Sequence, residues 1–179
     1  MSQALSLGVI LLSLIFSPLA LAVEPESSSL EIRKLILGME PTAIGVTREN
    51  FKHPVWGLIM ETGFPEGSFT LVALANGTTG LYYSTGGGTD GAGKHASVRA
   101  ASGHLLVGAQ YFYAQAKPVN SYPLPGAGEV KFYFLGFDQV SSYSAFEVDL
   151  GEQRDPLSNL FNAGHKLIDE LRKVQQAEQ

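Results

Sequence analysis

The stretch VWGLIMETGFPEGSFTLVALANGTTGLYYST, residues 55–85, decides the fold of this chain. It contains three runs rich in apolar and β-branched residues, separated by turns that contain Gly, Pro and Asn, which is the pattern of consecutive strands. The pattern predicts strands over 55–62, 68–75 and 78–85. Because short turns join them, neighbouring strands should pair in antiparallel fashion.

The dipeptide Asn76-Gly77 favours a two-residue type I′ turn, which needs positive φ at both residues. Such a turn would place Val72 opposite Leu81 on one face of the hairpin, and Leu71 opposite Tyr82 on the other. Both faces then carry large apolar groups, whereas a sheet with one wet face alternates apolar and polar residues. We therefore expect helices or a partner to cover both faces, and Leu71 and Tyr82 are candidate interface residues.

Amphipathic helices flank the three strands. Apolar residues at helical spacing predict a short helix that ends near Gly38, a helix over about 94–116 and a last helix after Asp155-Pro156. Two further strands are expected over 129–138 and 143–150. The residues expected to be buried in the core are Ile32, Leu35, Val72, Leu81, Val98, Leu105, Phe112, Phe132, Phe146, Leu160, Phe161 and Ile168.

The order of these elements is α-β-β-β-α-β-β-α. It predicts a single α+β domain, built on a five-stranded, mainly antiparallel sheet with three helices. A chain of 179 residues fits one domain, which we place at residues 30–173. Residues 23–29 are expected to form a linker, and residues 174–179 a polar tail.

Residues 1–22 contain no charged side chain. An apolar run from Leu7 to Phe16 precedes Ala20-Leu21-Ala22, whose two small residues are typical of a signal-peptidase site. The pattern predicts cleavage after Ala22 and export to the periplasm or the cell exterior. However, no Lys or Arg precedes the apolar run, and the uncharged stretch is long enough to span a bilayer. A membrane anchor formed by residues 4–22 is therefore the alternative.

Composition limits the classes of partner and cofactor. The chain has 12 Lys and Arg against 17 Asp and Glu, so a nucleic-acid partner, which requires a basic face, is not expected. The absence of Cys excludes disulfides, thiolate metal sites and Cys nucleophiles. The four His lack the H-x-x-x-H and H-E-x-x-H spacings of a metal site, so we expect neither a metal nor another cofactor.

The glycine-rich segment 86–95 is a candidate ligand site. It contains GTDGAGK, residues 88–94, which matches the G-x-x-x-x-G-K pattern in which glycine N–H groups and a helix N-terminus hold a phosphate. The next residue is His rather than the Ser or Thr that holds Mg²⁺, and the preceding strand belongs to a hairpin. A flexible connector is therefore the alternative interpretation. The candidate anion-binding residues are Gly88, Gly91, Gly93, Lys94 and His95.

Catalytic motifs are absent, because the sequence contains neither G-x-S-x-G nor S-x-x-K. Glu61 and Asp138 could act as a carboxylate pair only if the fold brought them together. Tyr111 and Tyr113 flank a predicted core Phe on one helix, so one of them should project outward, and both are candidate interface residues.

These observations favour a non-catalytic binding or protein-interaction module that contacts another protein or a copy of itself. A phosphate- or nucleotide-binding protein that uses segment 86–95 is one alternative. A small hydrolase with a site that the sequence does not reveal is another.

Overall fold

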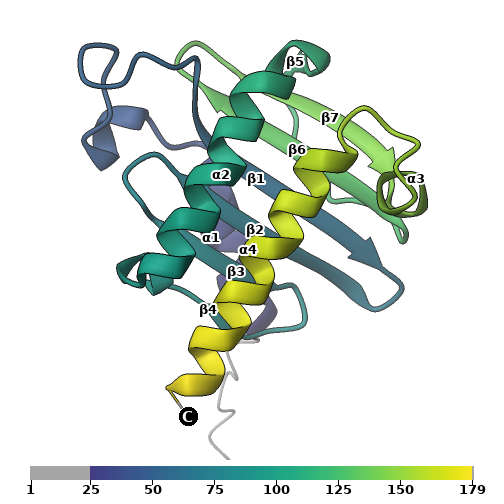
Figure 1. Ribbon diagram of the computed structural model, residues 1–179. Coiled ribbons are helices and arrows are strands. Elements are labelled where there is room, and N and C mark those ends of the chain that lie inside the picture. The colour runs from purple at the N-terminus through teal and green to yellow at the C-terminus, as the bar shows by residue number, and fades with distance from the viewer. Residues whose placement is uncertain (1–24, 179) are drawn as a thin grey trace, which may run out of the picture.

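The computed structural model describes residues 25–178, in which one antiparallel sheet carries helices on both faces (Figure 1). The strand order is β4-β3-β2-β1-β6-β7-β5. The predicted signal peptide or anchor, with its cleavage site at Ala22, lies outside the described residues. Within the described residues, no helix has both the length and the apolar character needed to cross a membrane. The strands are β1 (Val55–Phe64), β2 (Gly67–Leu74), β3 (Thr79–Tyr83), β4 (Gly88–Thr89), β5 (Lys117–Val119), β6 (Glu129–Gly136) and β7 (Val140–Phe146).

The α-helices of the described residues are α1 (Pro25–Leu37), α2 (Ala96–Phe112), α3 (Glu147–Gly151) and α4 (Ser158–Ala177). Short 3₁₀ turns η1 (Pro41–Ile44), η2 (Ala92–Lys94) and η3 (Tyr113–Gln115) accompany them. Helix α1 begins inside the segment that was expected to be a linker. Helices α2 and α4 lie side by side across one face of the sheet, and α1 lies behind the other face (Figure 1).

The expectation of five strands and three helices is wrong, because the described residues form seven strands and four α-helices. The two additional strands, β4 and β5, lie at the two edges of the sheet. They are short and contain Gly or Pro, so they lack the apolar run by which a strand is recognised in sequence. The strand expected over 143–150 exists with other bounds, because β7 spans Val140–Phe146 and the chain turns into α3 at Glu147. Glu147 and Asp149 in the first turn of α3 favour that helical start.

The hairpin between β2 and β3 differs by one residue from the predicted register. Leu71 lies opposite Leu81, and Tyr82 lies opposite Thr70. The N–H of Gly77 donates to the carbonyl of Leu74 at 2.9 Å, so the loop has three residues and ends on a glycine with φ of +89°. Asn76 does not have positive φ, as a type I′ turn would require.

The expectation that both faces of the hairpin are covered is confirmed. Two buried clusters lie on opposite faces of the sheet, one beneath α2 and α4 and the other beneath α1 and η1. The inward stripe of α4 is apolar, as its sequence spacing predicts. The predicted core residues that are buried are Val72, Leu81, Val98, Leu105, Phe132, Leu160, Phe161 and Ile168.

Four residues that were expected to be buried are more exposed. Leu35 is 65% exposed because α1 turns Arg33 and Ile36, rather than Leu35, toward the sheet. Phe146 is 64% exposed because β7 ends there and the chain turns away into α3. Ile32 and Phe112 are half-buried at the margins of the two clusters.

Candidate functional site

Helix α2 is held in place on two sides. Its inner stripe, which packs toward the sheet, consists of Val98, Ser102, Leu105 and Ala109. On the side toward α4, a methyl group of Leu160 fits against Gly108, where a Cβ would lie only 3.0 Å from it. The helix is therefore a rigid support for the side chains that point away from the sheet.

The outward side of α2 carries exposed apolar side chains. Ala100, Gly103, Val107 and Tyr111 recur at three- and four-residue intervals, so they form one stripe along the helix, which we call the outer stripe. Val107 is 69% exposed and Tyr111 is 82% exposed. Gly103 has no heavy atom within 4 Å of the place where a Cβ would lie, so the helix surface there is open.

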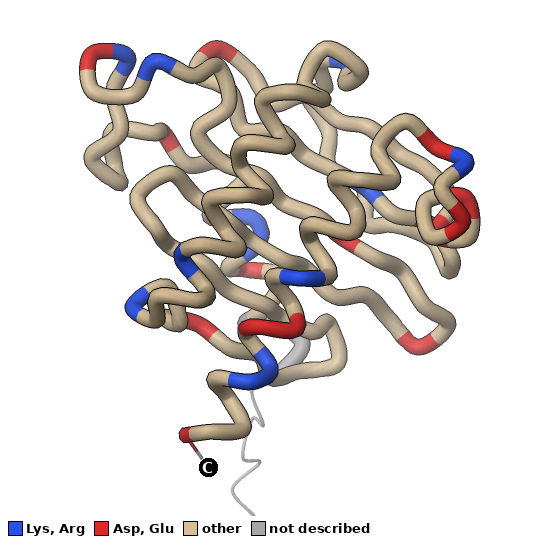
Figure 2. Tube along the Cα trace, viewed as in Figure 1, with Lys and Arg blue, Asp and Glu red and all other residues tan. Residues whose placement is uncertain are grey.

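The outer stripe itself contains no Lys, Arg, Asp or Glu, and the charged residues of α4 lie beside its Ala100 end, where Lys166, Asp169, Glu170 and Lys173 line a surface hollow with Ala100. Arg99 is the only charged residue among the 17 residues of α2, and its guanidinium donates back to the carbonyls of Gly93 and Lys94. The first eight residues of α4, SNLFNAGH, carry no Lys, Arg, Asp or Glu. Figure 2 shows the charges of the helix layer gathered toward the C-terminal end of α4. A surface helix normally carries charged residues on its outer side, so the half of α2 that carries Val107 and Tyr111 has the character of a contact surface.

The four candidate interface residues lie in different environments. Tyr111 projects from α2, whereas Tyr113 is half-buried with its ring 6.0 Å from that of Phe134. Leu71 is fully buried beneath the helices, and Tyr82 is half-buried on the opposite face of the sheet. Burial, together with the nearby Asp90, raises the pKa of Tyr82. Only Tyr111 of the four is thus freely accessible to a partner.

The candidate anion-binding glycines have roles in chain packing. Gly88 pairs with Tyr82 at the sheet edge, and a Cβ there would overlap the carbonyl oxygen of Leu81. A Cβ at Gly93 would overlap the carbonyl oxygen of Gly77 in the hairpin loop. Gly91 has a left-handed conformation with φ of +64° at the start of η2. These close approaches and this turn account for the glycines without a ligand.

The cationic end of the glycine-rich segment faces a carboxylate of the same chain. Helix α4 runs antiparallel to α2 (Figure 1), so its last turn reaches the start of α2. Lys94 Nζ lies 3.1 Å from Glu178 Oε1, and His95 Nε2 lies 3.3 Å from the same oxygen. Lys94, with His95, lowers the pKa of Glu178. An external anion would have to compete with this carboxylate.

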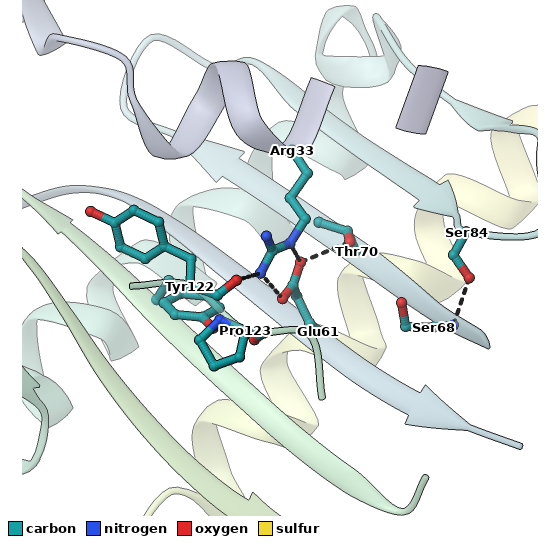
Figure 3. Close-up of polar contacts among 8 residues, drawn as sticks. Arg33, Glu61, Ser68, Thr70, Ser84, Tyr122 and Pro123 are labelled. Carbon is teal, nitrogen blue, oxygen red and sulfur yellow. Dashed lines mark hydrogen bonds and ion pairs between the residues drawn. The ribbon is translucent and has the colours of Figure 1, made fainter. Parts of the chain in front are cut away.

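Sequence reasoning missed a buried ion pair on the other face of the sheet. Arg33 of α1 reaches Glu61 of β1, with Nε donating to Oε1 at 2.5 Å and Nη2 to Oε2 at 2.9 Å (Figure 3). Nη2 also donates to the carbonyl of Tyr122, and Thr70 Oγ1 donates to Glu61 Oε1 at 3.0 Å. The sequence contained a signal for this pair, because Glu61 is the only charged residue in a mostly apolar central strand. The pair fastens α1 and the segment around Tyr122 to the sheet.

This arrangement separates the two acids that could have formed a catalytic pair. Glu61 is fully buried against Arg33, whereas Asp138 pairs with Arg48 at the surface. Val55 lies opposite Gly136, so Glu61 is six residues along β1 from the end that approaches Asp138. At about 3.3 Å per residue the separation along the strand is roughly 20 Å. The structure therefore does not bring these carboxylates together.

Beside the buried pair, Tyr133 secures the connector that leads from β5 to β6. Its hydroxyl donates to the carbonyl of Pro123 at 2.7 Å. Burial, reinforced by the negative charge of Glu61, raises the pKa of Tyr133 to about 12. The tyrosine is therefore a neutral hydrogen-bond donor at physiological pH, and its role is structural.

Within residues 25–178, no group of three or more His, Asp or Glu side chains is placed to hold a metal ion. Comparison with known proteins found no match for this chain among protein-family models, curated proteins or solved structures.

Proposed function

We propose that this chain is a non-catalytic protein-interaction module that binds a protein partner through the outer stripe of α2. The observation that carries the proposal is the exposure of Val107 and Tyr111 on a helix side without charged residues. Tyr is enriched among the residues that dominate binding energy, since its large ring loses little conformational freedom when it is buried. Val107 supplies apolar contact beside that ring, and Gly103 leaves the helix surface open to a partner's side chain.

Rigidity supports the same proposal. The inner stripe and Gly108 fix α2 against the sheet and α4, so the outer stripe needs little rearrangement before it binds. The glycine-rich segment is a weaker candidate, because Lys94 already faces Glu178 and the glycines have packing roles.

The proposal also includes the cellular compartment of the protein. The leader-like sequence of residues 1–22 supports export, with the mature chain beginning after Ala22, and a membrane anchor over residues 4–22 is the alternative. The N-terminal residue of the protein purified from its native cell, together with the cell fraction that contains it, tests this part. A retained initiator methionine in the soluble cytosolic fraction would contradict it.

Site-specific photocrosslinking in the native cell tests the interaction surface. A benzoylphenylalanine is placed at position 111 and, as the control, at position 35. Leu35 is 65% exposed on α1, across the sheet from α2, so the two positions are matched in accessibility. We expect a discrete crosslinked protein from position 111, lost when Val107→Lys is added, and none from position 35. No adduct at position 111, or an adduct that Val107→Lys leaves unchanged, would contradict the proposal.

A further inference from the structure

A hollow on the α1 side of the sheet lies between α1 and the connector that leads from β5 to β6. Its volume is about 540 Å³, which is within the range of sites that bind small molecules. Its apolar lining comes from Leu30 and Leu37 of α1 and from Tyr122 and Leu124 of the connector. Leu30 is 41% exposed and Leu124 is 42% exposed, so both walls offer apolar surface to a ligand.

The charged residues that line this hollow are both cations. They are Arg33 and Lys34, and none of the described residues of the lining is Asp or Glu. Lys34 is exposed and forms no ion pair with a described side chain. The chain as a whole has 12 Lys and Arg against 17 Asp and Glu, so a hollow lined by cations differs from its average surface. Such a lining is complementary to an anion.

Arg33 is held so that one of its nitrogens stays available. Its Nε and Nη2 donate to Glu61, and Nη2 also donates to the carbonyl of Tyr122, whereas Nη1 takes part in none of these bonds (Figure 3). Tyr133 lies against the guanidinium, with its ring centroid 5.7 Å from Cζ. Because Glu61 offsets the charge of Arg33, Arg33 supplies a fixed N–H donor and Lys34 supplies the net positive charge.

The two walls of the hollow are fastened to each other. The bond from Arg33 to the carbonyl of Tyr122 joins α1 to the connector, and the hydroxyl of Tyr133 in β6 donates to the carbonyl of Pro123 at 2.7 Å. The hollow is therefore formed before a ligand arrives, and binding needs little ordering of the protein.

We propose that this hollow binds a small amphiphilic carboxylate of the fatty-acid type. The carboxylate would accept hydrogen bonds from Nη1 of Arg33 and Nζ of Lys34, and the hydrocarbon chain would lie against Leu30, Leu37 and Leu124. The hollow and the outer stripe of α2 lie on opposite faces of the sheet (Figure 1). The inference thus goes beyond the proposed function and does not depend on it.

Isothermal titration calorimetry with decanoate, on the protein purified from its native cell, tests this inference. We expect saturable binding of one decanoate per chain. Lys34→Gln should weaken the binding about tenfold, because it replaces a hydrogen bond between charged groups by a weaker one. Lys166→Gln removes an exposed lysine of α4 across the sheet and should leave the affinity unchanged. The inference is overturned if decanoate does not bind saturably at millimolar concentration, or if the two lysine variants bind it equally well.

Titration with 1-decanol separates the charge of the ligand from its shape. This alcohol has a hydrocarbon chain of similar length without the carboxylate, so Lys34→Gln should leave its affinity unchanged. A loss of affinity for 1-decanol as large as that for decanoate would show that Lys34 does not recognise an anion.

The apolar wall is tested at Leu124. Leu124→Ser removes apolar surface from the hollow and should weaken decanoate and 1-decanol alike, by about tenfold. Leu35→Ser makes the same change at an exposed position of α1 that does not line the hollow, so it should bind both ligands as the wild-type protein does. Equal affinities of these two variants would place the hydrocarbon chain elsewhere and overturn the inference.

This inference and the proposed function can fail separately. If decanoate does not bind and photocrosslinking at position 111 still yields a discrete adduct, the inference is wrong and the proposed function stands. If decanoate binds as expected and position 111 yields no adduct, the proposed function fails and the inference stands.

Discussion

Arg33 and Glu61 form a two-point ion pair between α1 and the central strand, in which the carboxylate has no exposed surface. Burial alone would lower the pKa of Arg33, but the charge and hydrogen bonds of Glu61 outweigh it and raise that pKa. The guanidinium of Arg33 therefore keeps its charge when the protein is folded. This buried ion pair holds α1 on the sheet only while both side chains are present.

Removing one side chain of this ion pair should destabilise the folded protein. Arg33→Met leaves the Glu61 carboxylate buried without its cation, and we expect the free energy of unfolding to fall by about 3–5 kcal/mol. Chemical denaturation measures this loss. The double variant Arg33→Met with Glu61→Leu should lose clearly less than Arg33→Met alone, because no unpaired charge remains. A single variant as stable as the wild-type protein would show that the pair is not formed in solution.

Two leucine positions test the helix faces. Leu105 is 1% exposed on the inner side of α2. Leu105→Ala should lower the free energy of unfolding by about 2–5 kcal/mol, because it removes buried apolar surface and leaves a cavity. Leu35 is 65% exposed, and Leu35→Ala should change the free energy by less than about 0.5 kcal/mol. Equal losses for the two variants in denaturant titrations would mean that the helices are oriented differently.

The hairpin loop can be tested at Gly77. This residue has φ of +89° with no heavy atom within 4 Å of a Cβ, so a side chain would strain the backbone without a clash. Gly77→Val should cost at least about 1–2 kcal/mol, because a left-handed conformation is unfavourable for a side chain branched at Cβ. Gly77→Asn, which tolerates that conformation better, should lose less. The melting temperatures of the two variants measure this difference. An equal fall in melting temperature for Gly77→Asn and Gly77→Val would exclude a left-handed conformation at position 77.

His165 should make stability depend on pH. Its ring lies between Phe69 and Phe161, with ring centroids 6.5 Å and 4.3 Å away, and its Nε2 is buried without a hydrogen bond. Burial lowers its pKa below the ordinary 6.5, although Glu147 and Asp169 act in the opposite direction and Arg172 in the same direction. Below pH 6.5 the unfolded chain therefore binds more protons than the folded chain.

The contribution of His165 to the free energy of unfolding is fully present above the pKa that the residue has in the unfolded chain. It is lost as the pH falls toward the lower pKa that the residue has in the folded protein. We expect the wild-type protein to lose more stability than His165→Gln when the pH is lowered from 7 into this window. His53→Gln, at an exposed position before β1, should behave like the wild-type protein. Parallel stability curves for the wild-type protein and His165→Gln would contradict this prediction.

The parts of the fold that follow from strong local periodicity could be predicted. The buried stripe of α4 repeats at helical spacing, and the apolar runs of β1, β2 and β6 mark central strands. Edge strands β4 and β5 could not be predicted, because only two or three residues pair there. The register of the hairpin depended on whether Asn76 adopts positive φ, and a three-residue loop with the same dipeptide is a close alternative.

The candidate site could be predicted only in part. The sequence predicts that one of Tyr111 and Tyr113 projects outward, and in the structure this residue is Tyr111. Val107 and Gly103 could not be assigned, because an apolar residue on a helix is more often buried than exposed. The inward position expected for Leu35 fails for a related reason, because the sequence does not show that α1 turns Arg33 toward Glu61.

The most direct measurement of the central claim is the rate of maleimide labelling at position 107. Single-cysteine variants Val107→Cys and Leu35→Cys are labelled both in the native cell and as dilute purified protein. If a protein covers the outer stripe of α2, position 107 should react much more slowly in the cell than in dilute solution, whereas position 35 should react equally fast in both. Equally fast labelling of position 107 under the two conditions would contradict the account.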